Sequence, residues 1–466
     1  MLVAGFKREH GLVNALTTAG LAASLLVFIF VDPVLPLQAT ELLYFDGYSL
    51  FFSGLIIFGA LAVSILAYPY FESHNALNEE FYILLLTATL GAVVLACSTH
   101  FVSFFIGMEM LGVSLYAMIA YPVHEEKSAK FPLEAAIKYL IMSGLASGLI
   151  LFGIALLYAL TGTMFFSDLA PAIEAQDVAA SPVLVTGWLM IIAGIAFKLS
   201  LVPFHIWTPD VYEGAPVPVT AYLATVSKAS MLAVVLRLLL ISDAFQYDAL
   251  MLVLTVMAAA SMLLGNLLAL MQANVKRLFA YSSIAHLGYL LVVIIAAASV
   301  PGMLSVESMS FYVAAYFIMS LGGFAVTNAI SNSGKELDMI SDYQGLFWRN
   351  PWLAAVMITV LFSLAGIPLT AGFIGKFYVF TSGVEGSLWF LLTMLIIGSA
   401  IGLYYYLRII YAMLQSVEKV SKQDPAGQAI PFGTHAVLAS MSAIIIYLGV
   451  YPMPMIDILQ SLAAAF

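Results

Sequence analysis

Long runs of hydrophobic residues, separated by short polar stretches, make up most of the chain. A run of about 20 apolar residues is long enough to cross the hydrocarbon core of a bilayer as an α-helix. The runs are continuous and do not alternate with polar residues, which excludes a membrane β-barrel. The pattern therefore predicts an all-α polytopic membrane protein with thirteen full spans, near residues 11–31, 47–69, 81–99, 101–121, 133–161, 182–208, 215–241, 249–271, 278–298, 308–331, 351–381, 387–414 and 433–455.

The composition agrees with one membrane domain over residues 1–466. Of these residues 63% are hydrophobic and 9% are charged, which is far more apolar than soluble domains need. There is no basic patch, so we expect no nucleic-acid partner. The single cysteine, Cys97, excludes an intrachain disulfide and a cysteine-only iron–sulfur site. No nucleotide-binding or zinc-protease motif occurs, so we expect neither a metal nor a cofactor in this chain.

The positive charges in the predicted connections lie on one side of the membrane. When the spans are counted, one side, here called the basic face, receives ten of the 16 lysines and arginines: Lys7, Arg8, Lys127, Lys130, Lys276, Arg277, Lys335, Arg349, Lys419 and Lys422. The opposite connections, on the acidic face, are 32–46, 162–181, 242–248, 299–307 and 382–386. They contain no lysine or arginine, and all their charged residues are aspartate or glutamate. The positive-inside rule predicts that the basic face is cytoplasmic and that the C-terminus lies outside.

Two lysines, Lys198 and Lys376, lie within apolar runs and within eight residues of Pro203 and Pro368 respectively. A charge at bilayer depth costs at least about 2.5 kcal/mol, so it needs a partner, water or a function. Each proline is expected to break its helix and to leave carbonyls one turn earlier free to bind water or ions. The break follows the first lysine and precedes the second, as an inverted repeat would require. This pattern predicts a pathway for protons or other cations.

Glu109 lies in the middle of a predicted span. A lysine beside it would keep both groups charged, and a change in their separation would alter both proton affinities. Our hypothesis is that Glu109 and Lys198 form such a switch. The alternative is a static ion pair that clamps two helices.

The sequence offers further candidates for proton transfer. Lys228 lies among small and hydroxylic residues that leave room for water, which predicts a relay rather than a lysine that snorkels to the surface. His205 and His286 are possible relays because histidine exchanges protons near neutral pH, although a buried structural histidine is the alternative. Lys138 is a possible relay for which snorkelling competes. We expect structural roles for Arg237 and Arg408, and a rigid acidic loop at 207–218.

Four stretches carry a resemblance to a known family: 197–216, 274–289, 366–378 and 399–408. They resemble the antiporter-like subunits of respiratory complex I, the bacterial proton-pumping NADH:quinone oxidoreductase, and most closely the subunit N branch. The resemblance covers nearly the whole chain. Lys376 speaks against the related subunit M branch, which has glutamate there. The chain departs from the family at its start, where Met1–Phe6 look like the remainder of a first helix.

The resemblance implies a fold of fourteen helices with two inverted five-helix repeats, each containing a broken helix. The repeats would fall at 81–241 and 249–414, between N-terminal helices at 1–80 and a loop and C-terminal helix at 415–466. It further implies a hydrated axis of charged residues. Glu109 and Lys198 would be its coupled pair, Lys228 the connecting residue and Lys376 the terminal lysine of the second half. Lys138 matches a further family lysine of less certain role.

The implied function is proton translocation in the inner membrane of a bacterium, driven by electron transfer from NADH to quinone in partner subunits. The flavin, iron–sulfur clusters and quinone would lie in those partners, and the neighbours would be subunit M, the small membrane subunits and lipid. Two alternatives stay open, a subunit of an Mrp-type sodium/proton antiporter and a structural anchor that pumps nothing. Protonated lysines cannot ligate sodium, which favours protons.

Overall fold

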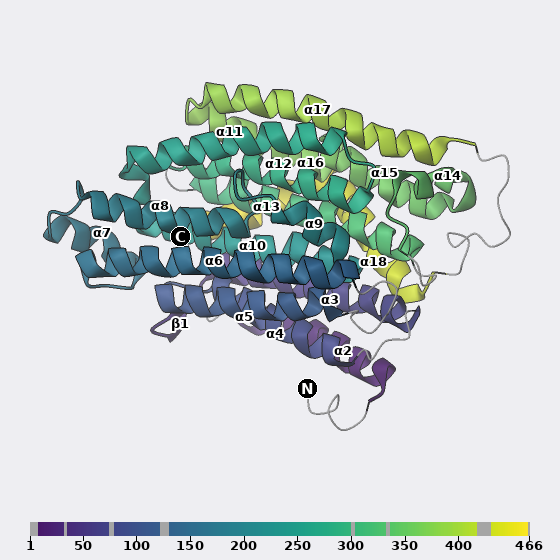
Figure 1. The fold of residues 1–466 in the computed structure, drawn as a ribbon, viewed down its shortest axis with the longest axis horizontal. Helices are drawn as coiled ribbons and strands as arrows, with labels where there is room; N and C mark the ends of the chain where they lie inside the picture. Colours follow the sequence, from purple (N-terminus) through teal and green to yellow (C-terminus); the bar gives the residue numbers. More distant parts are fainter. Residues whose placement is uncertain are drawn as a thin grey trace.

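The fold is all-α and polytopic, as the hydrophobic runs predict. The computed structural model describes residues 8–31, 35–73, 79–121, 130–299, 303–331, 336–416 and 430–464. In this part of the chain the long helices lie side by side (Figure 1). They are accompanied by one β-hairpin, formed by β1 (Leu37–Thr40) and β2 (Leu43–Phe45), in the connection predicted at 32–46.

Eleven of the described helices are long and apolar enough to cross a membrane. These are α2 (His10–Val31), α3 (Gly47–Ser73), α4 (Glu79–Ala96), α5 (Phe101–Ile119), α6 (Lys130–Thr161), α10 (Val217–Ile241), α11 (Asp248–Leu270), α12 (Val275–Ala296), α13 (Met303–Ile330), α17 (Trp389–Leu414) and α18 (Phe432–Val450). Each matches one predicted span. Two pairs of shorter helices account for the other two spans: α8 (Pro182–Lys198) with α9 (Trp207–Gly214), and α15 (Pro351–Ala365) with α16 (Ala371–Glu385).

Both pairs of shorter helices are spans that break near their prolines. The first helix of each pair ends at Lys198 or at Ala365, ahead of Pro203 and Pro368. The second break turns at Gly366, whose φ of 84° lies in the left-handed region that glycine adopts without a steric penalty.

The predicted end of the last span, 433–455, is wrong. The helix α18 stops at Val450, and a further helix, α19 (Met453–Ala464), follows. Gly449 lies against the break between α15 and α16, since a Cβ added there would come within 2.3 Å of the Cα of Thr370. The C-terminal span is therefore interrupted too, beside the second broken span.

Five spans lie in each of the two ranges expected to be repeats. The first range contains α4, α5, α6, the α8–α9 pair and α10, and the second contains α11, α12, α13, the α15–α16 pair and α17. In both, the fourth span is the broken one. The repeat boundaries themselves stay a prediction.

Several segments expected to be loops are helical. The connections hold α7 (Phe166–Ala175), α14 (Leu346–Arg349) and two 3₁₀ turns, η3 (Ala244–Gln246) and η4 (Ile340–Tyr343). The prediction of a loop at 207–218 is wrong, because α9 and the first turn of α10 occupy it. The expectations for Met1–Phe6, Lys7, Lys127, Lys335, Lys419 and Lys422 lie outside the described residues.

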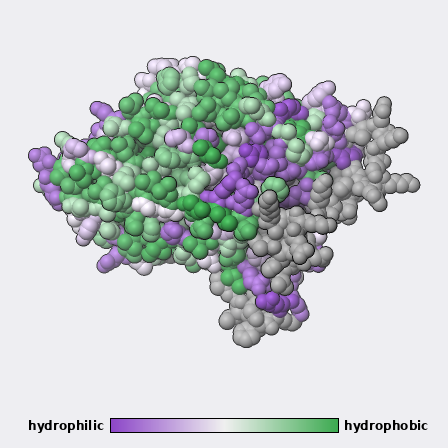
Figure 2. Space-filling view, in the orientation of Figure 1, coloured by the Kyte–Doolittle hydropathy of each residue, from purple (hydrophilic) through white to green (hydrophobic). Residues whose placement is uncertain are grey.

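Two helices form the centre of the bundle. In α12 and α13, 94% and 100% of the residues in the most apolar stretch are buried. The face in Figure 2 is mainly hydrophobic in its middle, with hydrophilic residues gathered toward the ends of the helices. Polar side chains on α12 and α13 therefore face protein and not lipid.

Gly372 offers a test of the packing at the second break. A Cβ at this position would lie 1.8 Å from the carbonyl oxygen of Ser363, so Gly372→Ala forces the two half-helices apart. Overpacking of this kind costs about 1–3 kcal/mol or more. We expect a lower melting temperature for the purified protein in detergent. Gly20→Ala is the matched control, since nothing lies within 4 Å of its added Cβ, and equal melting temperatures for both variants would contradict this packing.

Candidate functional site

Lys198 and Glu109 are joined through α6. Lys198 is 8% exposed, and its Nζ donates a hydrogen bond to Ser143 Oγ at 2.6 Å. Ser147 Oγ donates to Glu109 Oε1 at 2.5 Å. The two serines are four residues apart on one helix and so share a face. The structure does not bring the lysine and the glutamate within the 4 Å of a direct ion pair, and their functional coupling stays a prediction.

A small cavity continues from Lys198 toward α10. Its volume is about 10 Å³, and its lining includes Lys198, Tyr139 and Ser227. That volume is close to what one water molecule requires. Ser227 directly precedes Lys228, so this cavity lies between the two lysine-bearing regions.

Lys228 is 1% exposed and points at α12. Its Nζ donates to Ser283 Oγ at 2.5 Å, and the same oxygen accepts a hydrogen bond from Tyr316 Oη at 2.7 Å. The ammonium also lies 5.4 Å from the centre of the Tyr212 ring. Snorkelling to the surface is therefore not how this lysine is accommodated.

His286 follows one turn further along α12. Its Nδ1 lies 2.7 Å from Tyr312 Oη, and its Nε2 lies 3.3 Å from Tyr406 Oη. Tyr406 in turn forms a hydrogen bond with Ser282. Both ring nitrogens thus have hydroxyl partners, and the role of His286 as a relay stays a prediction.

Lys376 lies beyond this group, on α16. Its Nζ donates to the carbonyl oxygen of Ala365 at 2.9 Å and lies 5.6 Å from the centre of the Tyr289 ring. Ser283, His286 and Tyr289 are three residues apart along α12 and therefore follow one side of it. This side of α12 leads from Lys228 to Lys376.

The two lysines at the breaks share one electrostatic environment. Lys198 is the last residue of α8, and Lys376 binds the last carbonyl of α15. The Lys376 ammonium therefore lies at the negative, C-terminal end of α15, and Lys198 belongs to the last turn of α8, where a cation is favoured. Near the first break, the carbonyl oxygen of Phe197 accepts a hydrogen bond from Trp207 Nε1 at 3.0 Å. That the carbonyls one turn before the two prolines bind water or ions stays a prediction.

Lys198, Lys228, His286 and Lys376 follow one another through the bundle and are called the lysine row below. Two of the possible relays lie apart from this row. Lys138 is 43% exposed and forms ion pairs with Glu134 and Asp210, both at 2.8 Å. His205 lies half-buried in the link between α8 and α9, and among the described residues its Nδ1 has no hydrogen-bond partner.

The two membrane arginines have structural partners. The side chain of Arg237 is 1% exposed and pairs at 2.7 Å with Asp46, which lies in the connection before α3 as expected. Arg408 donates to the carbonyl oxygens of Leu270 and Gln272. Arginine stays protonated in proteins, so these contacts fit permanent charges.

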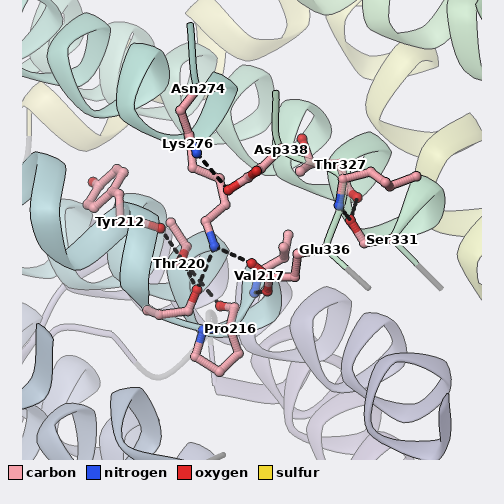
Figure 3. A network of polar contacts seen from close by, with 12 residues as sticks. Tyr212, Pro216, Val217, Thr220, Asn274, Lys276, Thr327, Ser331, Glu336 and Asp338 are labelled. Atoms are coloured by element: carbon pink, nitrogen blue, oxygen red, sulfur yellow. Dashed lines mark hydrogen bonds and ion pairs between the residues drawn. The ribbon is translucent and has the colours of Figure 1, made fainter. Parts of the chain in front are cut away.

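Lys276 corrects the assignment of the basic-face connections. It was expected in a loop, but it lies in the first turn of α12 with a side chain that is 0% exposed. Its Nζ donates to Glu336 Oε2 at 2.6 Å and to the carbonyl oxygen of Ala215 at 2.9 Å (Figure 3). Tyr70 Oη donates to Glu336 Oε1 at 2.6 Å. This cluster ties α3, the α9–α10 junction and α12 together.

Asp338 lies beside the same cluster, outside the spans. Its Oδ2 accepts a hydrogen bond from Asn274 Nδ2 at 2.7 Å. Burial raises the pKa of the Asp338 carboxyl, and the nearby Lys276 ammonium opposes that shift.

Comparison with known proteins identifies the family. A family described as NADH:quinone oxidoreductase/Mrp antiporter, TM, matches residues 98–402. NADH-quinone oxidoreductase subunit N of Methylococcus capsulatus is 47% identical over 460 residues, which are 98% of this chain and 90% of that protein. The chain belongs to the NADH-quinone oxidoreductase subunit N family.

Solved structures share the fold of this subunit N family member. A chain of respiratory complex I from Thermus thermophilus matches with a TM-score of 0.81 and 30% identity, over 98% of this chain and 96% of that chain. A chain of the Mrp complex from Dietzia sp. DQ12-45-1b matches with a TM-score of 0.86 and 18% identity, over 99% and 94%. At so low an identity, the second likeness shows the fold alone.

The hydroxyl groups between the lysines were missed in the sequence. Ser143, Ser147, Ser283, Tyr312 and Tyr316 are common residue types, and nothing in one sequence says which face of a helix they share with a lysine on another. The four-residue spacing of the two serines on α6 is the one signal that pointed to a shared face. Tertiary packing of the subunit N fold supplies the rest.

The Lys276–Glu336 pair gives a prediction about stability. Lys276→Met leaves a partly buried carboxylate without its cation, which we expect to lower the free energy of unfolding by about 3 kcal/mol. The double variant Lys276→Met/Glu336→Met should recover most of the loss, because apolar replacement of a whole buried pair is often neutral. Thermal unfolding in detergent measures both. Additive losses in the double variant would show that the pair does not act as a unit.

Proposed function

We propose that the chain is a membrane-arm subunit of a proton-translocating NADH–quinone oxidoreductase and that protons move along its central polar row. Membership of the subunit N family supports the assembly, with subunit M and the small membrane subunits as neighbours in the bilayer. The flavin, iron–sulfur clusters and quinone belong to partner subunits, which carry out the electron transfer. This chain then belongs to a translocase without doing redox chemistry itself.

One observation carries the proposal. Lys198 and Lys228, which are buried, and Lys376, which is half-buried, are linked to hydroxyl groups or helix ends. Among the described residues, no carboxylate lies within 4 Å of any of these lysines. Burial of charge in this way is costly, so lysines kept there are functional candidates by default. Lysine can release its proton when buried, whereas arginine cannot.

The row suggests how the residues act. Lys198 holds its proton against Ser143 while the Glu109 carboxylate lies one helical turn away across Ser147. Movement of Glu109 away from Lys198 weakens the reason for that amine to stay charged. The proton then passes through the water-sized cavity toward Lys228, and from there along the hydroxyl groups of α12.

The second half receives the proton through His286 and ends at Lys376. His286 bridges two tyrosine hydroxyls and can pass a proton from one nitrogen while accepting one at the other. Lys138 and His205 lie off this line, so we propose at most entry roles for them. The charge pattern supports a plasma-membrane location with the basic face in the cytoplasm and the C-terminus outside.

The Mrp-type antiporter is the second candidate, and the shared fold favours it equally. Identity separates the two, since the match to subunit N extends over nearly the whole chain at 47%. A passive anchor would not need three interior lysines linked through hydroxyl groups.

Lys198→Ala tests the proposed function. Loss of the ammonium removes the first proton site of the row, so we expect NADH-driven proton pumping in membrane vesicles to fall at least about tenfold. Arg8→Ala, which removes an exposed cation paired with Glu80, is the control and should pump normally. Assembly of the complex is checked in parallel.

Unchanged assembly with unchanged pumping in Lys198→Ala would contradict the proposal. A charge swap, Glu109→Lys with Lys198→Glu, separates the switch from a static clamp. A clamp tolerates the swap, whereas a switch that depends on a lysine proton does not.

A further inference from the structure

Glu307 is a buried carboxylate that the row does not use. The hydrophobic pattern placed it in a connection of the acidic face, but it lies within α13 and is 5% exposed. Its Oε1 accepts a hydrogen bond from Tyr378 Oη at 2.6 Å. Tyr378 is two residues beyond Lys376 on α16.

The packing of α13 against α16 fixes the level of this carboxylate. Tyr312 lies against Gly375, where an added Cβ would come within 2.8 Å of its ring. Further toward the acidic face, Ser382 donates to Ser308 at 2.9 Å. The residue numbers rise on one helix as they fall on the other, so the two helices run antiparallel.

This register places Glu307 on the acidic-face side of Lys376. By the same pairing, Lys376 lies opposite residues 311–312 of α13. Glu307 is about four residues nearer the start of that helix, which corresponds to an axial offset of about 6 Å. A lysine side chain spans a comparable length, so Glu307 lies about one turn from the last lysine of the row.

We propose that Glu307 is the proton-exit residue of the second half, which rests on the proposed function of the lysine row. The Lys376 ammonium gives a proton to the Glu307 carboxylate through intervening water, leaving a neutral amine and a carboxylic acid. The acid then releases the proton to water on the acidic face and returns to the carboxylate. Tyr378 is a positioning residue that holds the carboxylate toward α16.

The surroundings of Glu307 fit this role better than that of an ion-pair partner. Within the described residues, no cation lies within 4 Å of its carboxylate. The remaining explanation is a helix clamp, in which the carboxylate serves only as an acceptor for Tyr378. An amide oxygen accepts that hydrogen bond equally well but cannot carry the proton.

Glu307→Gln therefore distinguishes exit from clamp in the assembled complex. We expect NADH-driven proton pumping in vesicles to fall at least about tenfold, and Glu307→Asp to restore much of it. Tyr378→Phe should cause a smaller loss, because the carboxylate remains. Glu385→Gln, which removes an exposed carboxylate at the end of α16, is the matched control and should pump normally.

Normal pumping with Glu307→Gln in an assembled complex would overturn the inference. Lys376→Ala measured alongside keeps this result separate from the proposed function. If Lys376→Ala abolishes pumping while Glu307→Gln does not, the row stands and its exit lies elsewhere. If neither variant lowers pumping, the lysine row itself is not the pathway. If Glu307→Gln fails to assemble, pumping by Glu307→Asp decides, and a loss there despite assembly overturns the exit role.

Discussion

The cost of placing lysine ammonium groups inside a membrane protein governs the centre of this structure. Each of the three lysines of the row meets that cost with local dipoles and not with a carboxylate in contact. Lys198 is the last residue of one half-helix and Lys376 binds the last carbonyl of another, and both helix ends exist because the spans break there. Lys228 uses the hydroxyl of Ser283. The broken helices and the hydroxyl groups thus have the same effect, because both stabilise a lysine ammonium group inside the protein.

The central helices α12 and α13 connect the two halves. They are buried on nearly all sides, and they supply the partners of both Lys228 and His286. Successive residues of α12 therefore contact the two halves, since Ser283 binds Lys228 of the first half and His286 binds Tyr312 of the second. On the basic face, Lys276 links the start of α12 to the α9–α10 junction. This contact fixes the position of α12 relative to the end of the first broken span.

Much of the fold follows from hydropathy, because about 20 apolar residues have few ways to satisfy their backbone in lipid other than a helix. The positions of the two broken spans follow from proline in the same way. The contacts of the site do not, since they depend on which helix faces which. Glu109 was expected to pair with Lys198, yet each of the two forms a hydrogen bond with a different serine of α6. Hydropathy also failed at helix ends, where Lys276 and Glu307 look like loop residues but are buried.

Lys228 is where the account is most directly tested, because it joins the two halves of the row. The measurement is proton pumping driven by NADH oxidation in vesicles containing the assembled complex with Lys228→Met, which keeps a side chain of similar length without an ionisable group. The account predicts a fall of at least about tenfold with assembly intact. Pumping at the level of the unaltered protein would contradict the claim that protons cross this chain along its lysine row.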